Sequence, residues 1–200
     1  MFQLPPDGTI VFFEISDGKK VLPGTLSIAS VGEKSVDGKK CRWIEIRLFG
    51  TENDRKIDFL AKLLIPEKYL TAGQNPLKHA IKGRIKSLGF GPEEFQDYKN
   101  SLLLAYYLTG TLEDQHNLKP AVISTKLGKL ECPGIVGTNV YTDHGVYVLV
   151  ESWLSKKVPF GLVSSHMQFV VGDGGRFTSS CIVRILKTGR KAISEMPDFQ

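Results

Sequence analysis

Apolar and polar residues alternate along the first third of the chain with the period of two that is typical of half-buried β-strands. The pattern predicts four strands, over residues 9–15, 24–31, 40–49 and 56–65. In the third strand, the even-numbered residues from Arg42 to Leu48 share one face, and the odd-numbered residues from Cys41 to Phe49 share the other. Asp-Gly turn signals at 17–18 and 37–38 separate neighbouring segments. We therefore expect an antiparallel meander.

The periodicity changes near residue 75. Asn75 is a suitable helix N-cap and Pro76 suits the first helical position. Apolar residues then recur at helical spacing up to Gly89, which stands where a C-terminal cap belongs: Leu77, Ile81, Ile85 and Leu88. This predicts a short amphipathic helix over 75–88. A second helix is predicted from Pro92 to Tyr106, although its apolar end over 102–108 also fits a buried strand.

Strand patterns return after residue 119, over 121–126, 129–132, 135–142, 146–154, 161–171 and 177–187. Pro133-Gly134 and the glycine-rich 172–175 are interpreted as turns between them. The fold class is therefore mainly β (α+β). We expect one domain over 1–200, a strongly curved, open antiparallel sheet like a half-barrel. It would have roughly seven to eleven strands, with one or two helices, from an insertion at about 75–108, on its concave face.

Composition and charge change this picture little. The 200 residues are 42% hydrophobic and carry a formal net charge of +5 from 26 basic and 21 acidic residues. Because the basic residues are scattered, we expect no nucleic-acid partner. One basic group is local: Lys78, Lys82, Arg84 and Lys86 share the polar side of the first predicted helix. It is either a solvated face or a peripheral contact with anionic lipid or a partner.

No catalytic or metal-binding pattern stands out, so we expect no catalytic residue, no metal, no cofactor and no enzymatic activity. Cys41, Cys132 and Cys181 form no CxxC motif, and at most one disulfide can join them. The four histidines form no close pair. Glu45 and Glu151 lie within predicted strands, where we expect them to face solvent; an enzyme would need one of them, or a histidine, in a pocket.

The segment from Trp153 to Gly161 is the most distinctive. It predicts a hairpin between two alternating strands, with Pro159 unable to donate to a sheet and Gly161 permitting a tight bend. Its apolar tip, Val158 and Phe160, should fold back as a lid on the core or at a ligand mouth.

Four segments together resemble uncharacterised secreted proteins of planctomycete-type bacteria: KCRWIEI (40–46), LIPEKYL (64–70), GQNPLKHAIKGRIK (73–86) and WLSKKVPFGLV (153–163). That family is similar to the periplasmic lipoprotein carriers of the LolA/LolB type. The resemblance implies an open curved sheet around helices, with an apolar cavity that takes acyl chains in the carriers. It also implies a periplasmic or secreted location, with a leader absent from the sequence; the residues themselves leave a cytoplasmic location open.

Two functions follow from these observations. The first is a non-enzymatic cell-envelope protein that binds or carries an acyl chain, another apolar ligand or a lipoprotein between sheet and helices. Its expected cavity lining is Phe13, Trp43, Phe59, Leu63, Trp153, Phe160 and Phe169. The alternative is a structural or protein-interaction module, in which these residues fill the core and no small ligand binds.

Overall fold

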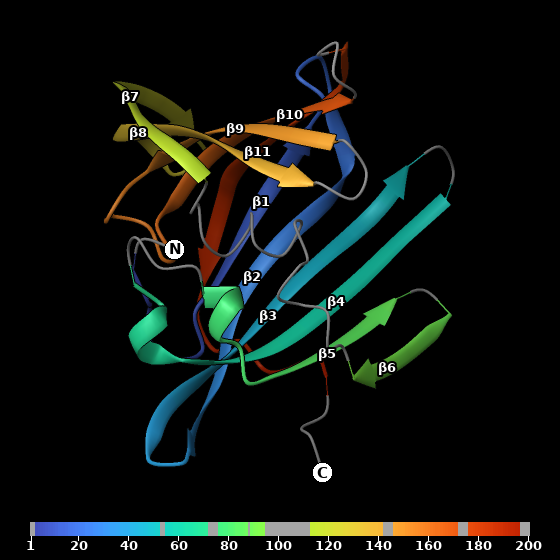
Figure 1. Ribbon diagram of the computed structural model, residues 1–200, viewed down its shortest axis with the longest axis vertical. Coiled ribbons are helices and arrows are strands. Elements are labelled where there is room, and N and C mark those ends of the chain that lie inside the picture. The colour runs from blue at the N-terminus through green and yellow to red at the C-terminus, as the bar shows by residue number, and fades with distance from the viewer. Residues whose placement is uncertain are drawn as a thin grey trace.

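The computed structural model describes residues 3–52, 55–71, 76–87, 89–94, 113–141, 146–171 and 176–196. Eleven strands form one sheet in the order β6-β5-β4-β3-β2-β1-β11-β10-β9-β8-β7, and every neighbouring pair is antiparallel (Figure 1). The strands are β1 (Ile10–Ser16), β2 (Val21–Val36), β3 (Lys39–Glu52), β4 (Arg55–Pro66), β5 (Lys82–Ser87), β6 (Phe90–Glu94), β7 (Glu113–Thr125), β8 (Gly128–Tyr141), β9 (Val146–Leu154), β10 (Leu162–Val171) and β11 (Arg176–Gly189). The predicted mainly β, open antiparallel sheet is confirmed. Within these ranges, no helix is long and apolar enough to span a membrane.

The predicted turn at Pro133-Gly134 is wrong, because both residues lie inside β8. Pro133 has no N–H to donate, but it stands opposite a register shift of β7 between Leu118 and Ala121, where regular ladder bonds are already interrupted. A side chain at Gly134 would lie within 3.2 Å of the indole nitrogen of Trp153, so this glycine allows the indole to pack against the strand.

The predicted helix over 75–88 is also wrong. Its start is a 3-10 turn, η2 (Pro76–His79), and its remainder is strand β5. The backbone N–H of Ile81 donates to the Leu64 carbonyl of β4, and β5 then pairs with β4. Alternation of basic Lys82, Arg84 and Lys86 with Gly83 and Ile85 suits a strand equally well. The second predicted helix begins in β6, and its remainder lies outside the described residues.

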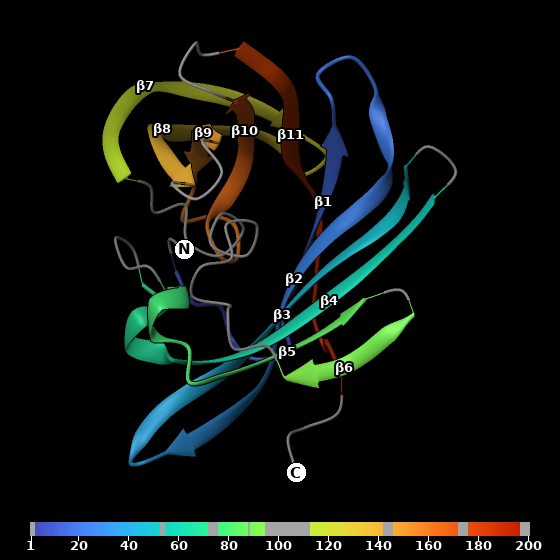
Figure 2. The ribbon, with the colours of Figure 1, turned by 45° about the vertical axis from the view of Figure 1, so that its right-hand side comes forward.

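The sheet is strongly bent, and its inner face holds the main core. Strands β2 to β4 form one limb and β7 to β10 form the other (Figure 2). Two 3-10 turns, η1 (Glu67–Tyr69) and η2, stand on the inner side in place of the expected α-helices. Leu70, which follows η1, and Leu77, within η2, are fully buried. The core unites inner-face residues of both limbs, including Val11, Phe13, Leu26, Ile28, Ile44, Ile46, Leu63, Val148, Val150 and Val183.

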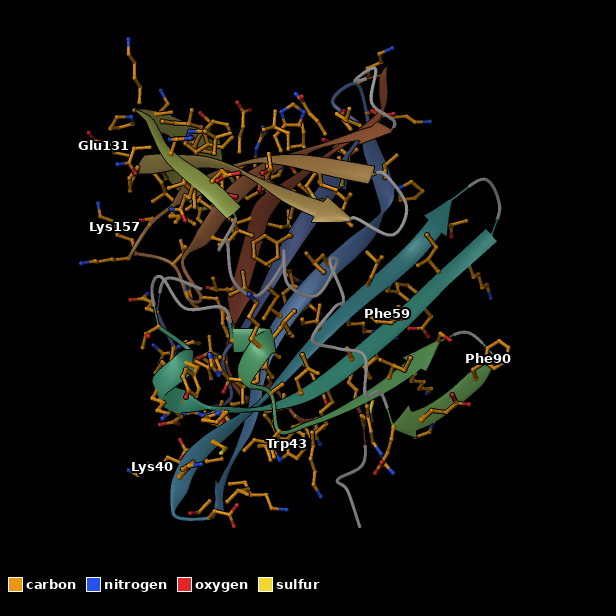
Figure 3. All side chains as sticks on the ribbon, in the orientation of Figure 1. Lys40, Trp43, Phe59, Phe90, Glu131 and Lys157 are labelled. Atoms are coloured by element: carbon orange, nitrogen blue, oxygen red, sulfur yellow. The ribbon has the colours of Figure 1, made fainter. Side chains whose placement is uncertain are left out.

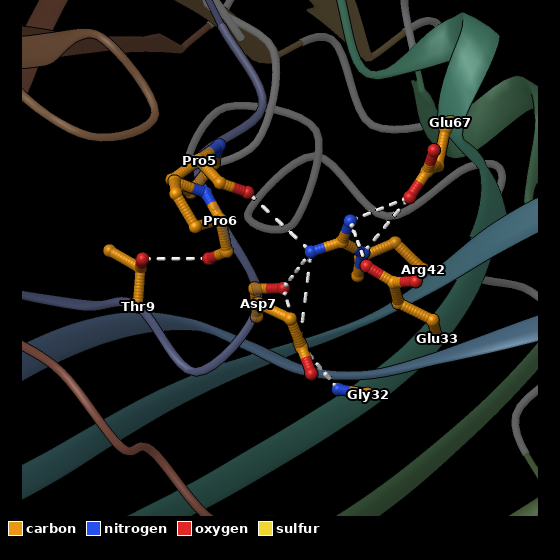
Figure 4. Close-up of polar contacts among 9 residues, drawn as sticks. Pro5, Pro6, Asp7, Thr9, Gly32, Glu33, Arg42 and Glu67 are labelled. Carbon is orange, nitrogen blue, oxygen red and sulfur yellow. Dashed lines mark hydrogen bonds and ion pairs between the residues drawn. The ribbon is translucent and has the colours of Figure 1, made fainter.

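A buried arginine fixes the base of this inner face. Arg42 of β3 donates from Nη2 to Glu67 of η1 at 2.6 Å and pairs with Glu33 of β2 at 2.8 Å (Figure 4). Its Nη1 donates to Ser30 Oγ at 3.0 Å and lies 3.7 Å from Asp7, whose carboxylate also accepts the N–H of Gly32. The guanidinium therefore joins the N-terminal segment and η1 to the sheet.

Residues 190–196, here called the C-terminal strap, cross the outer face. Glu45 was expected to face solvent, but the strap covers it and leaves it 4% exposed. Its carboxylate accepts the hydroxyl of Ser194 and the backbone N–H of Glu195. Lys62, fully buried beside it, donates to Ser194 Oγ at 2.8 Å and to the Met196 carbonyl at 2.9 Å. Two charges on the outer face are thus used to hold the strap.

Candidate functional site

An apolar hollow of about 160 Å³ opens at the end of the inner face where β1 to β4 meet β11. The side chains of Ile15, Leu22, Leu48 and Ile57 surround it, and the Cys181 thiol borders it on β11. Pro23, Gly24, Phe49, Gly50 and Thr51 complete its lining. The hollow is continuous with the main core, because Ile15 belongs to that core and Leu22 and Leu48 pack against it.

Two glycines create this space. Gly24 of β2 is paired with Gly50 of β3, so neither strand places a side chain on the inner face at this level. The two backbones approach closely: a Cβ at Gly50 would meet the Pro23 carbonyl oxygen at 2.5 Å. Glycine inside a strand commonly marks such an approach. The sequence held one signal for this pair: Gly24 and Gly50 lie at similar distances before and after the Asp37-Gly38 turn, so a hairpin brings them opposite each other. The expected cavity lining did not include either glycine.

The structure brings most of the expected lining residues to the inner face. Phe13 and Leu63 are fully buried in the main core, and Phe160 is 3% exposed in the same core. Phe59 and Trp153 pack against it while half-buried. Phe59 does not border the hollow itself, but it pairs with Leu48, which does, and it follows Ile57 by two residues on the same face of β4.

Trp43 does not join them. It packs with Cys41 and Leu64 in a separate cluster on the outer face, and the Lys62 ammonium lies 5.0 Å from its ring centroid. Figure 3 shows Trp43 and Phe59 on opposite sides of the β3–β4 pair. Phe169 lies in β10, but its side chain is outside the described part of the structure.

The distinctive segment after β9 folds back as predicted. Val158 and Phe160 are both buried in the main core. The Ser155 N–H donates to the Gly161 carbonyl at 2.8 Å, and Phe160 and Gly161 both take the left-handed conformation, with φ of 60° and 84°. The Gln3 amide donates to the carbonyls of Lys156 and Val158, which ties the tip to the N-terminal segment. The tip therefore covers part of the main core.

Titratable groups add one feature to the hollow. All three cysteines are free thiols, and Cys41 and Cys132 are buried. Burial raises the pKa of the Cys181 thiol to about 11, so this wall of the hollow is neutral at ordinary pH.

The described histidines and strand carboxylates do not converge on the hollow. His166 Nδ1 lies 3.4 Å from Glu151 on the outer side of β9 and β10, and His79 stacks on Tyr69. No group of three potential metal ligands occurs among the described residues, and His144 lies outside them.

No family model and no curated protein matches the sequence. Two solved structures are similar to the chain. One is described as a "putative exported protein with YmcC-like fold" from Bacteroides fragilis NCTC 9343, with a TM-score of 0.41 and 8% identity, over 93% of this chain and 99% of that one. The other is a "putative lipoprotein" from Parabacteroides distasonis ATCC 8503, with a TM-score of 0.42 and 11% identity, over 94% and 98%. These matches give no link to the LolA/LolB carriers or to planctomycetes. We therefore argue function from the residues of this chain.

Proposed function

We propose that this chain is a non-enzymatic protein of the cell envelope that holds the apolar end of a ligand, such as an acyl chain, in the inner-face hollow. The observation that carries the proposal is the Gly24–Gly50 pair, which leaves an apolar space beside an otherwise close-packed core. Close-packed interiors rarely contain such a space without a reason. The envelope location is part of the proposal as an expectation from the sequence resemblance, and acyl binding in the hollow does not depend on it.

The size of the hollow sets what it can hold. A volume of about 160 Å³ accommodates about five water-sized groups, so it would take the end of a chain and not a whole lipid. Each buried methylene contributes about 0.8 kcal/mol. An end of about five methylenes would then contribute roughly 4 kcal/mol, about a thousandfold in affinity.

Titration with an environment-sensitive fluorescent acyl probe, followed by displacement with a long-chain fatty acid, tests this function. Ile57→Gln places an amide in the hollow and should weaken probe binding at least tenfold. Val21→Gln is the matched control, because Val21 is 61% exposed and does not line the hollow. Trp43→Phe, on the outer face, should also leave binding unchanged. Absence of saturable binding, or equal loss in all three variants, would contradict the proposal.

The alternative function, a structural or protein-interaction module with a filled core, is favoured by one observation. Strand β7 is the last strand of the sheet order, and its Val122 is 63% exposed. Edge strands present backbone groups that can pair with another chain. If the acyl probe does not bind and Val122→Lys abolishes self-association measured by sedimentation, the interaction module is the better description.

A further inference from the structure

A second and larger hollow lies on the opposite, outer face of the sheet. Its volume is about 340 Å³, within the range typical of small-molecule sites. Eight residues line it, from three N-terminal strands, β11 and the strap: Phe12, Thr25, Ser27, Arg47, Phe49, Leu186, Lys187 and Glu195. The two hollows share one lining residue, Phe49, and every other lining residue differs, so the inference from the outer hollow does not rest on the proposed function.

The register of the sheet explains why the outer hollow exists. Lys187 pairs with Phe12, Phe12 with Ser27, and Ser27 with Arg47, which forms one row across four strands. Thr25 pairs with Phe49 on the same face. Strand β2 therefore contributes two short hydroxyl side chains between the longer ones of its neighbours. The outer hollow, called the trough below, therefore has a polar floor of Thr25 and Ser27 and aromatic walls of Phe12 and Phe49.

The charges of the trough are unequal. Arg47 is paired with Asp58 at 3.4 Å and with Glu195 of the strap, and its guanidinium carbon lies 5.2 Å from the Phe49 ring centroid. The Lys187 ammonium lies 4.6 Å from the Phe12 ring centroid. Among the described residues, no carboxylate forms an ion pair with Lys187. Within the described part of the chain, Lys187 is thus the basic group of the trough without an ion-pair partner, and it lies beside the Phe12 ring, while Asp58 and Glu195 are both engaged with Arg47.

The spacing of the aromatic walls fits one flat ring between them. Phe12 and Phe49 stand two strands apart and are offset by two residues along the strands, so their Cα atoms lie about 10–12 Å apart. A flat ring held above Ser27 and Thr25 would stand between the two phenyl side chains, where the aromatic-pair spacing of about 4.5–7 Å can be met on either side. An anionic group on that ring could then reach Lys187 and the hydroxyls of Ser27 and Thr25.

We propose that the outer hollow is a binding site for a small organic monoanion with a flat apolar body, of the aryl carboxylate class. The aromatic body lies between Phe12 and Phe49, and the carboxylate accepts hydrogen bonds from Lys187 and the floor hydroxyls. The strap completes the site, because Glu195 holds the Arg47 guanidinium at one wall.

Isothermal titration of the full chain with 2-naphthoate tests this assignment, with 2-naphthylmethanol as the neutral comparator. We expect saturable binding of one naphthoate per chain, at least tenfold tighter than binding of the alcohol. Lys187→Gln should weaken naphthoate binding about fivefold to tenfold and leave the alcohol unaffected. Lys40→Gln, a lysine exposed at the β2–β3 hairpin, is the matched control. Ser27→Phe should fill the trough and weaken binding of both compounds at least tenfold.

Two results would overturn the proposal. One is absence of saturable naphthoate binding to the folded chain. The other is equal binding by Lys187→Gln and Lys40→Gln, which share the same charge change. Lys187 is exposed, so its variant folds even if Ser27→Phe does not. Ile57→Gln on the inner face should bind naphthoate normally while losing the acyl probe, which separates this proposal from the proposed function.

Discussion

Replacing Lys62 with methionine should release the C-terminal strap and destabilise the fold. The Lys62 side chain is fully buried, and its ammonium donates to the strap at Ser194 Oγ and at the Met196 carbonyl. The Ser194 hydroxyl in turn donates to Glu45, so the serine joins the two buried charges. Methionine preserves the length and apolar stem of the side chain but removes the charge and its donors.

The expected cost follows from what the substitution leaves behind. Removing one member of a buried charge pair costs about 3–5 kcal/mol, because the other charge stays buried without compensation. Glu45 would keep the backbone N–H of Glu195, at 3.0 Å, so we expect the lower end, about 3 kcal/mol. For a chain of 200 residues, this corresponds to a decrease in Tm of roughly 6–12 °C.

Urea unfolding of four proteins measures this effect: the parent, Lys62→Met, Glu45→Gln and the double variant. Because the double variant removes both charges, it should cost about 1 kcal/mol or less, which gives a coupling energy of about 2 kcal/mol or more. Lys86→Met is the matched control, since Lys86 lies exposed on the neighbouring strand, and its effect should stay within about 0.5 kcal/mol. A Lys62→Met cost below about 1 kcal/mol, or a double variant as unstable as the sum of the singles, would refute the reasoning.

Three further predictions concern other parts of the fold. Arg42→Ala should cost about 2–3 kcal/mol in urea unfolding, because it removes charged hydrogen bonds to Glu67 from a buried position; a cost within experimental error would contradict that role. Gly50→Ala should lower the free energy of unfolding in urea by about 1–3 kcal/mol, because its Cβ would meet the Pro23 carbonyl oxygen at 2.5 Å and force the strands apart. Unchanged stability would show that β2 moves aside at no cost and would contradict the close approach. The Cys181 thiol, whose pKa rises from 9.0 to about 11 on burial, should react slowly with a disulfide reagent at pH 8 and faster as pH approaches 11. Its neutral form stabilises the fold below pH 9, and that contribution is lost as pH rises through about 11; reaction at pH 8 as fast as in urea would contradict its burial.

The candidate sites were only partly predictable from the chain. Phe13, Phe59 and Leu63 could be assigned to one apolar face because strand alternation is a local property. The Gly24–Gly50 pair could not be recognised as the origin of a hollow, because its effect depends on which residues face each other across two strands. The outer trough likewise requires the register of four strands, which no single segment contains.

The sequence by itself determined where most strands lie, since side-chain alternation follows directly from the geometry of the extended backbone. Over residues 75–88 the spacing of Leu77, Ile81 and Ile85 predicted a helix, and that prediction was wrong because a strand with alternating basic residues produces the same local spacing. Pairing of β5 with β4 decided in favour of the strand, because it satisfies the backbone groups of β5 in a ladder.

The tertiary structure alone decided which faces are covered and by what. Alternation placed Trp43 and Glu45 together on one face of β3, and the structure keeps them on that face. The burial of Glu45 depends on the strap, whose Ser194 is 149 positions away along the chain. A hydrogen bond over that separation leaves no local pattern around either residue. A carboxylate that looks solvent-facing in sequence can therefore be buried whenever a distant segment supplies the donors that replace water.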